Sequence, residues 1–191
     1  MPTPSASLPA PSVRSARAED APALVALSRP FVRSGALRER PASLYAAQCD
    51  DFLVAEASAD SPDCLGSPGS LAGCVGLRLY PAGLEGTGGL EGTGGLGGPE
   101  GPGEGPGSVG VLYNFCVAEH RQGRGVGAGL LRAVLAVARA RSLSALFTAT
   151  TGGGDLFLRY GFAPTTAHRA PTAWAASLDP RRNARILTMS L

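Results

Sequence analysis

The stretch SVGVLYNFCVAEHRQGRGVGAGLLRAVLAVARAR, residues 108–141, decides the fold of this chain. Residues 109–117 are mostly apolar, which predicts a buried strand. A loop with the glycine pattern Q-x-x-G-x-G follows at 122–127, and apolar residues then recur at helical spacing. A strand, a glycine loop and an amphipathic helix in this order aim several backbone N–H groups at one point. The stretch therefore predicts an anion-binding site.

Three kinds of anion-binding loop fit this outline to different extents. A P-loop requires a lysine, and the chain contains none. A dinucleotide fingerprint fits at Gly123, Gly125 and Ala128, but it requires an acidic residue about 20 positions later. None lies between Ala128 and Gly154. The loop meets in full what an acyl-coenzyme A pyrophosphate needs, namely glycines for close approach and a helix N-terminus.

The rest of the chain predicts an α+β fold in a single domain, 13–191, after a flexible N-terminus, 1–12. A glycine-rich insert, 81–108, interrupts the domain, and its composition predicts disorder because it carries too few apolar groups to offset its ordering entropy. Pro30 is expected to limit the first helix. Residues 51–56 and 70–80 are expected to pair as antiparallel strands. Further strands are expected at 13–17 and 143–150, from Phe162 and at the C-terminus, and further helices at 38–49 and 155–160, with Trp174 in a stretch that favours neither type.

Composition excludes several functional classes. The formal net charge is +2, and the 17 basic residues, all arginine, are scattered, so we expect no nucleic-acid partner. The four cysteines form no C-x-x-C pair and only His120 and His168 accompany them, so we expect no metal. Apolar sequence around Cys74 and Cys116 predicts reduced, buried thiols. No secretory signal or membrane span is evident, and we expect a cytoplasmic protein without a membrane partner.

The motif VAEHRQGRGVGAGLL, residues 117–131, resembles motif A of the GNAT acetyltransferase superfamily. Further stretches resemble the short amino-acid acetyltransferases of arginine biosynthesis, the N-acetylglutamate synthase type. These are 35–45, 50–56, 71–81, 150–162 and 169–187. The resemblance implies a central mixed, mostly antiparallel sheet flanked by helices, with acetyl-CoA at a splayed central strand. It implies acetyl transfer from acetyl-CoA to the amine of a small amino acid, glutamate first.

The resemblance also implies site residues. Those expected to bind the cofactor are Cys116, Val117, Gln122, Gly123, Arg124, Gly125, Val126, Gly127 and Ala128. Arg40 and Arg182 match arginines of the family, and planar guanidinium groups bind carboxylates through two hydrogen bonds. The alternative is that each is a solvated surface arginine. Ala184 departs from the family tail, which usually has serine there, and this puts the acceptor in doubt.

In the implied reaction the amine attacks the thioester directly, while a backbone N–H near Cys116 and Val117 polarises the carbonyl. Cys116 lacks the nearby His–acid pairing of a covalent nucleophile, so we interpret it as a buried thiol. Phe157 stands where many GNAT enzymes carry a tyrosine that protonates the leaving thiolate. Tyr113 is the remaining candidate for proton transfer, against the alternative of a core aromatic. His120 is interpreted as a solvated loop residue.

Two rival functions stay open. One is a GNAT enzyme acting on another amine, such as a polyamine, an antibiotic or a protein N-terminus; the missing acidic cluster argues against a polyamine. The other is a non-catalytic acetyl-CoA-binding module, which Ala184 makes credible. The expected partner is a small-molecule amine, and a homodimer is a further expectation.

Overall fold

The computed structural model describes residues 12–56, 71–81, 107–152 and 154–191. Most of the expected flexible N-terminus and of the expected glycine-rich insert lies outside these residues. At their edges, Ser12 donates a hydrogen bond to the Glu56 carboxylate and Ser108 is buried. The chain divides into two compact units, Met1–Gly76 with Asn114–Val134 and Leu77–Tyr113 with Leu135–Leu191.

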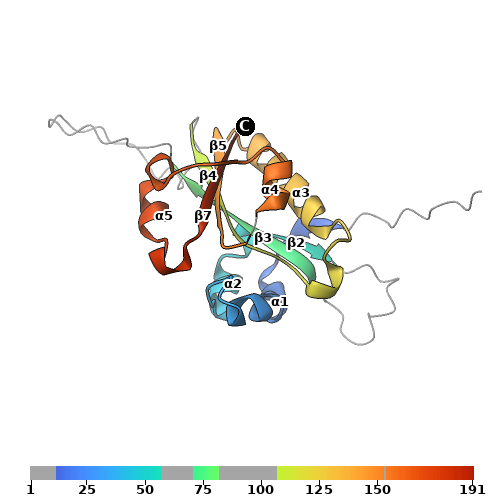
Figure 1. Cartoon of the computed structure of the whole chain (residues 1–191). Coiled ribbons are helices and arrows are strands. Elements are labelled where there is room, and N and C mark those ends of the chain that lie inside the picture. The colour runs from blue at the N-terminus through green and yellow to red at the C-terminus, as the bar shows by residue number, and fades with distance from the viewer. Residues whose placement is uncertain (1–11, 57–70, 82–106, 153) are drawn as a thin grey trace, which may run out of the picture. The chain divides into compact units, whose positions relative to one another are not determined.

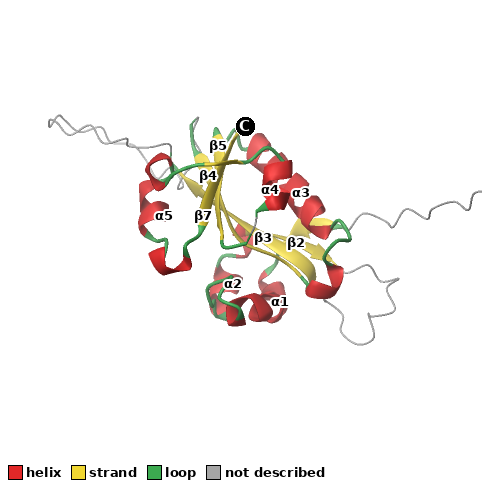
Figure 2. Cartoon of the chain, in the orientation of Figure 1, coloured by secondary structure: helices red, strands yellow, loops and turns green. Residues whose placement is uncertain are grey.

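The described strands form one open seven-stranded sheet in the order β1-β2-β3-β4-β5-β7-β6 (Figures 1 and 2). They are β1 (Val13–Ser15), β2 (Phe52–Glu56), β3 (Leu71–Tyr80), β4 (Val109–Val117), β5 (Ala145–Thr150), β6 (Ala163–Pro164) and β7 (Arg185–Ser190). β4 and β5 are parallel, whereas the pairs β1–β2, β2–β3, β5–β7 and β6–β7 are antiparallel. The predicted fold, a mixed and mostly antiparallel sheet flanked by helices, is confirmed, as is the predicted antiparallel pairing of β2 with β3.

The described α-helices are α1 (Ala21–Arg33), α2 (Ala42–Ala47), α3 (Val126–Ala140), α4 (Asp155–Arg159) and α5 (Thr172–Ala176). Short 3₁₀ turns are η1 (Ala18–Asp20), η2 (Cys49–Asp51), η3 (Glu119–Arg121), η4 (Ala167–Arg169) and η5 (Pro180–Arg182). No helix of the described residues is both long and apolar enough to cross a membrane.

In the first unit, helices cover both faces of β3. A Cβ atom on Gly73 would lie 2.9 Å from Leu130 of α3, so α3 packs tightly on that face. Cys74 points to the opposite face because successive strand residues alternate. There its neighbour Asn114 of β4 hydrogen-bonds to Ser28 of α1 and Tyr45 of α2. The glycine therefore lets α3 approach the strand closely, while α1 and α2 cover the other side.

In the second unit, α5 packs on β4 and β5. Its buried Trp174 lies 6.4 Å from the Phe147 ring, measured between ring centroids, and both belong to one apolar cluster with Val111 and Ala170. The sequence around Trp174 favours neither helix nor strand, and burial of the indole against the sheet explains why it becomes helical here. On β4, Gly110 leaves room for Leu146, which a Cβ atom would approach to 2.6 Å.

The expectation that Pro30 limits the first helix was wrong. α1 continues to Arg33, with Pro30 inside it. Pro30 has no N–H to donate and its ring crowds the carbonyl four residues earlier, but its own carbonyl still accepts the N–H of Ser34 at 3.0 Å. Gly35, at φ +75°, follows the last turn and adopts the left-handed conformation typical of a helix end. Pro30 therefore lies three residues before Arg33, the last residue of α1, and Gly35 follows the helix end.

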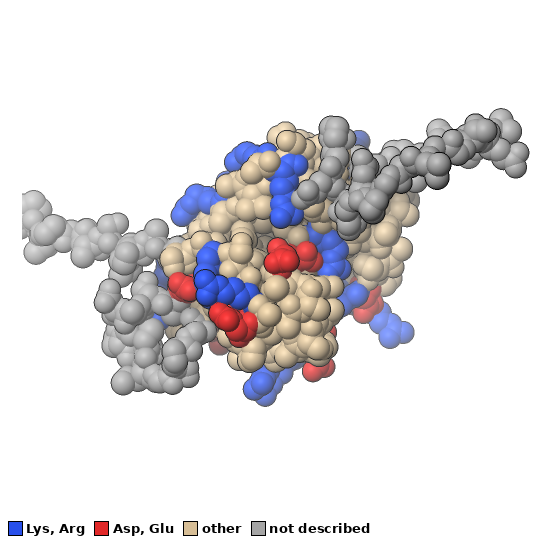
Figure 3. All heavy atoms as spheres, turned by 180° about the vertical axis from the view of Figure 1, so that it is seen from behind, with Lys and Arg blue, Asp and Glu red and all other residues tan. Residues whose placement is uncertain are grey.

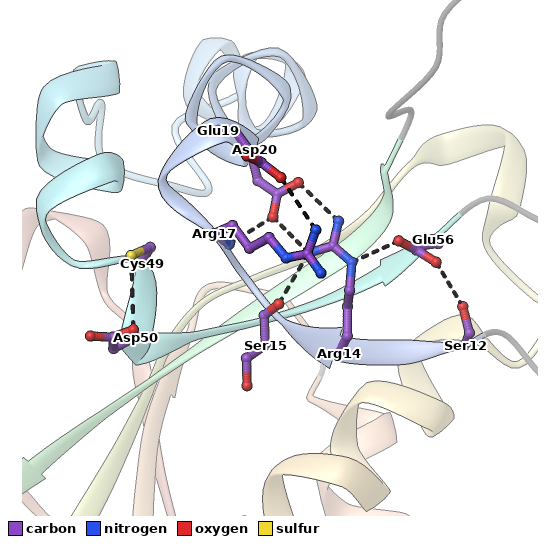
Figure 4. A network of polar contacts seen from close by, with 9 residues as sticks. All are labelled: Ser12, Arg14, Ser15, Arg17, Glu19, Asp20, Cys49, Asp50 and Glu56. Atoms are coloured by element: carbon purple, nitrogen blue, oxygen red, sulfur yellow. Dashed lines mark hydrogen bonds and ion pairs between the residues drawn. The ribbon is translucent and has the colours of Figure 1, made fainter.

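An ion-pair network fastens β1 to η1 and β2 (Figure 4). Arg14 binds Asp20 through two nitrogen atoms, at 2.7 and 3.0 Å, and Glu56 through Nε at 2.6 Å. The Arg14 guanidinium holds the pKa of Asp20 below its ordinary value of 3.8 and the pKa of Glu56 below its ordinary value of 4.5. The Asp20 side chain is only 8% exposed, so solvent screens this pair little.

Both lowered pKa values predict that acid weakens this network. The unfolded chain binds protons at higher pH than the folded chain, so the stabilisation is complete above the ordinary carboxylate pKa values and is lost as the pH falls through the lowered ones. We expect Asp20→Asn to lower the free energy of unfolding by about 2 kcal/mol at pH 7. The decrease in this free energy between pH 7 and 3 should be smaller in the variant than in the wild type. Urea denaturation at both pH values measures this.

Glu19→Gln is the matched control. Glu19 pairs with Arg17 at 3.3 Å, and their side chains are 73% and 67% exposed. An exposed pair contributes less than about 1 kcal/mol, so this variant should stay close to the wild type at both pH values. Equal effects of the two variants would contradict the special role of the Arg14 network.

Candidate active site

The loop between β4 and α3 is fastened to the end of β4. Ala118, the residue after the strand, donates its N–H to the Ala72 carbonyl of β3 at 2.9 Å. The Gln122 side-chain amide donates to the Val117 carbonyl at 3.2 Å. η3 fills the span between them, with His120 exposed at its centre. Gln122 thus closes the loop back on the strand that precedes it.

Two glycines in left-handed backbone conformations carry the chain into α3. Gly123 has φ +74° and Gly125 has φ +82°, and no heavy atom lies within 4 Å of where a Cβ atom would stand on either. Gly129 donates its N–H to the Gly125 carbonyl at 2.9 Å, an i→i−4 bond of the first turn of α3. The N–H groups before Gly129 therefore form the helix N-terminus, where an anion is favoured. Arg124, between the glycines, is exposed.

The hydrogen bond of Ala118 fixes the direction of the Val117 backbone. The carbonyl of one residue and the N–H of the next point in opposite directions across a trans peptide. Since the Ala118 N–H points to β3, the Val117 carbonyl points to the opposite edge of β4, where Gln122 binds it. In an extended strand, the N–H and carbonyl of one residue share an edge. The Val117 N–H is therefore directed to the edge beside Gln122.

The pairing of β4 with β5 stops short of the ends of both strands. The parallel register runs from Val109↔Ala145 to Leu112↔Thr148, whereas β4 continues to Val117 and β5 to Thr150. Asn114, two residues beyond the last pair, has φ +50°. This left-handed residue interrupts β4 at the point where the register ends.

The cofactor residues predicted from the sequence form one stretch of the first unit. Cys116 and Val126 are buried, Val117, Gly127 and Ala128 are half-buried, and the four residues from Gln122 to Gly125 are exposed. Cys116 places its Sγ 3.5 Å from the Cys74 Sγ, and both thiols are buried, as the sequence predicts. The pKa of Cys74 is raised, chiefly by the hydrogen bond with Cys116 and next by burial of the thiol.

The predicted substrate arginines lie in different units, and both are half-buried. Arg40 directly precedes Pro41, which is the N-cap of α2. Arg182 is the last residue of η5, a turn in which the Asp179 carboxylate accepts the N–H of Arg181. Their roles stay predictions.

The aromatic candidates lie in the second unit. Tyr113 is half-buried on β4, and the guanidinium carbon of Arg78 lies 5.1 Å from its ring centroid. Phe157 is buried in α4 and meets the Phe162 ring edge to face, with centroids 5.4 Å apart. The Phe157 ring thus packs in the interior, and it has no group that could donate a proton. Among the described residues, no group of three His, Cys, Asp or Glu side chains could hold a metal ion.

The family model for the acetyltransferase (GNAT) family matches residues 24–162, which include the strand, the loop and α3. The chain belongs to the GNAT acetyltransferase family. Membership of this family implies acyl transfer from acetyl-CoA. The residues from Gln122 into the first turn of α3 fit the pyrophosphate of such a donor because they combine open glycines with a helix N-terminus. A search among curated proteins gave no match.

Several solved structures share the fold of this chain. N-acetylglutamate synthase from Neisseria gonorrhoeae, complexed with coenzyme A and N-acetyl-glutamate, is 24% identical with a TM-score of 0.70, over 94% of this chain and 35% of the synthase. This chain therefore spans about a third of that protein. Rv2747 from Mycobacterium tuberculosis, in complex with CoA and NLQ, is 20% identical with a TM-score of 0.64 over 95% of this chain and 99% of Rv2747. A chain in the structure of the NatC complex bound to Gag peptide and CoA is 11% identical with a TM-score of 0.62, over 95% of this chain and 99% of that chain.

Both signs of charge occur on the face of the molecule drawn in Figure 3, where arginine side chains stand among carboxylates. This agrees with the scattered arginines of the sequence. The sequence interpretation also missed three buried polar residues near the predicted site, namely Ser28, Tyr45 and Asn114. One signal was available: asparagine is unusual inside an apolar strand, and it adopts positive φ more readily than most residues do.

Proposed function

We propose that this GNAT protein transfers the acetyl group of acetyl-CoA to the amine of a small amino acid, most readily glutamate, as in arginine biosynthesis. The observation that carries the proposal is the left-handed Gly125 at the start of α3, beside an end of β4 that Gln122 holds in place. Acetyl-CoA, when bound, supplies an activated acetyl group as a thioester.

The residues of the loop would act by position and charge. The N–H groups of the first turn of α3 would bind the pyrophosphate, and the open space around Gly123 and Gly125 lets it approach the backbone. The exposed Arg124 would add positive charge. The Val117 N–H, directed to the edge away from β3, would polarise the thioester carbonyl. Direct attack by the amine requires no covalent enzyme intermediate, in keeping with the buried Cys116 thiol.

The acceptor is inferred from the two arginines. Glutamate carries two carboxylates, and Arg40 and Arg182 are separate candidates for binding an acceptor carboxylate through a pair of charge-assisted hydrogen bonds. The similarity to N-acetylglutamate synthase supports this choice. Tyr113 would assist proton transfer, because Phe157 has no acidic proton to give.

A protein N-terminus is the second candidate acceptor. The favouring observation is the similarity to the NatC complex, which is bound to a peptide and CoA. The identity to that complex is 11%, against 24% for the synthase, so glutamate ranks first. Ala184, which lacks the hydroxyl usual in the synthase tail, leaves a non-catalytic acetyl-CoA-binding module as the third outcome.

One assay separates these functions. We expect the full chain to release free thiol from acetyl-CoA with glutamate at least tenfold faster than with other amino acids, a polyamine or a short peptide with a free N-terminus. The ranking follows from the need for two carboxylates. Faster turnover of the peptide than of glutamate would show that a protein N-terminus, and not glutamate, is the acceptor. Tight acetyl-CoA binding without turnover of any amine would refute both enzymatic functions.

A further inference from the structure

Two successive side chains of β4 point to the same face of the strand. Cys74 and Arg78 lie four residues apart on β3 and so share a face. Asn114 contacts Cys74, with its Nδ2 atom 3.6 Å from the sulfur, and the Tyr113 ring lies under the Arg78 guanidinium. Tyr113 and Asn114 therefore share that face too. An unbroken strand would alternate, so β4 contains a bulge at Asn114, where φ is +50°.

The side chain of Asn114 is held in a closed triangle of hydrogen bonds. The Tyr45 hydroxyl donates to Oδ1 at 3.3 Å, and Nδ2 donates to the Ser28 hydroxyl at 3.3 Å. The two hydroxyl oxygens lie 2.9 Å apart and share the third bond. Tyr45, Ser28 and Asn114 are 1%, 3% and 7% exposed, so water competes little for these bonds. Residues of α1 and α2 thus hydrogen-bond to the bulge from one face of the strand.

The backbone of Asn114 is held as well. The Cys74 thiol donates to its carbonyl at 3.4 Å. Asparagine tolerates positive φ better than other non-glycine residues, and a left-handed residue persists where its surroundings hold it. The triangle and the thiol therefore fix the bulge at this one position of β4.

The bulge decides which amide the strand presents beyond it. Shifting a strand by one residue exchanges the groups on its two edges and faces. Without the bulge, the Val117 N–H would point to β3 and Cys116 would leave the face of Cys74. With it, the Val117 N–H is directed to the edge where Gln122 binds the Val117 carbonyl.

We propose that Asn114 is a positioning residue for acetyl transfer: held by Ser28 and Tyr45, it maintains the bulge that directs the Val117 N–H toward the thioester carbonyl. This inference rests on the proposed function. The pyrophosphate loop begins five residues after Val117, and the first turn of α3 has its own hydrogen bond, from the Gly129 N–H to the Gly125 carbonyl. Loss of the triangle should therefore lower turnover and leave coenzyme A binding intact.

Asn114→Gly and Tyr45→Phe test the inference in the full chain. Glycine adopts φ +50° without strain but forms none of the side-chain bonds. Phenylalanine keeps the ring, which lies 5.3 Å from the Phe52 ring, and loses only the hydroxyl. With the best acceptor, we expect Asn114→Gly to lower kcat at least tenfold and Tyr45→Phe at least threefold, with the Kd of coenzyme A unchanged within twofold.

The double variant and a matched control add what a purely structural role would not give. Because Tyr45 acts through Asn114, the double variant should be no slower than Asn114→Gly. Ser28→Ala should lower kcat. Ser34→Ala removes an exposed hydroxyl at the end of the same helix, which donates to the Phe31 carbonyl, and should leave kcat unchanged.

An active wild type with unchanged kcat in Asn114→Gly would overturn the inference alone. Parallel losses of kcat, coenzyme A affinity and melting temperature would also overturn it, because they would mark a structural residue. A wild type that binds coenzyme A without transferring acetyl to any amine would remove the proposed function, and this inference with it.

Discussion

Replacing Gly125 by valine is expected to weaken acetyl-CoA binding at least tenfold. Gly125 has φ +82°, and a β-branched residue is strongly disfavoured in this conformation. The strain is about 1–3 kcal/mol, and the loop can relieve it only by leaving the conformation that binds the ligand; a tenfold change in Kd corresponds to about 1.4 kcal/mol. A valine side chain would also occupy the open space at Gly125 that the pyrophosphate needs. Calorimetric titration with acetyl-CoA measures the change in Kd.

Gly161→Val is the control for backbone strain alone. Gly161 has φ +92°, equally open surroundings and a place after α4 in the second unit. We expect it to lower the melting temperature by as much as Gly125→Val does, while the Kd of acetyl-CoA stays within twofold of the wild type. Wild-type affinity in Gly125→Val would refute the pyrophosphate assignment.

Replacing either Arg40 or Arg182 by alanine is expected to raise the KM for glutamate by about tenfold to a hundredfold. Each change removes charge-assisted hydrogen bonds to a carboxylate, which contribute about 1.5–3 kcal/mol. The Kd of acetyl-CoA should not change, since neither arginine belongs to the loop. Initial rates of thiol release at varied glutamate concentrations give kcat and KM separately.

Neighbouring arginines provide matched controls. Arg38 and Arg181 are exposed, whereas Arg40 and Arg182 are half-buried. Arg38→Ala and Arg181→Ala remove the same charge and should change the KM less than threefold. If all four variants behave alike, general electrostatic attraction explains the effect and the assignment of Arg40 and Arg182 is wrong.

The sequence predicted the structure of residues 108–141 well because local signals and tertiary structure agree there. Residues 109–117 are apolar, the glycines match a left-handed loop, and the helical spacing that follows corresponds to α3. The absence of lysine separated this loop from a P-loop. The resemblance of this stretch to GNAT proteins therefore predicted the family and, with it, the mixed sheet.

Features that depend on distant contacts could not be predicted from the sequence. Pro30 carries a strong local signal for a helix end, but the carbonyl of Pro30 still accepts the Ser34 N–H. The helix at Trp174 depends on the buried Phe147, far away in sequence. The bulge at Asn114 is held by hydroxyl groups from α1 and α2, which lie 86 and 69 positions away. Contacts distant in sequence decided the conformation at Trp174 and Asn114.

The central claim is that the loop before α3 binds the pyrophosphate of acetyl-CoA, and its most direct test compares two ligands. S-acetylpantetheine carries the thioester but neither the pyrophosphate nor the nucleoside. We expect the wild type to bind acetyl-CoA at least about a hundredfold more tightly, which corresponds to about 2.7 kcal/mol, and Gly125→Val to lose most of that difference. Equal affinity of the wild type for the two ligands, or a ratio that Gly125→Val leaves unchanged, would contradict the account.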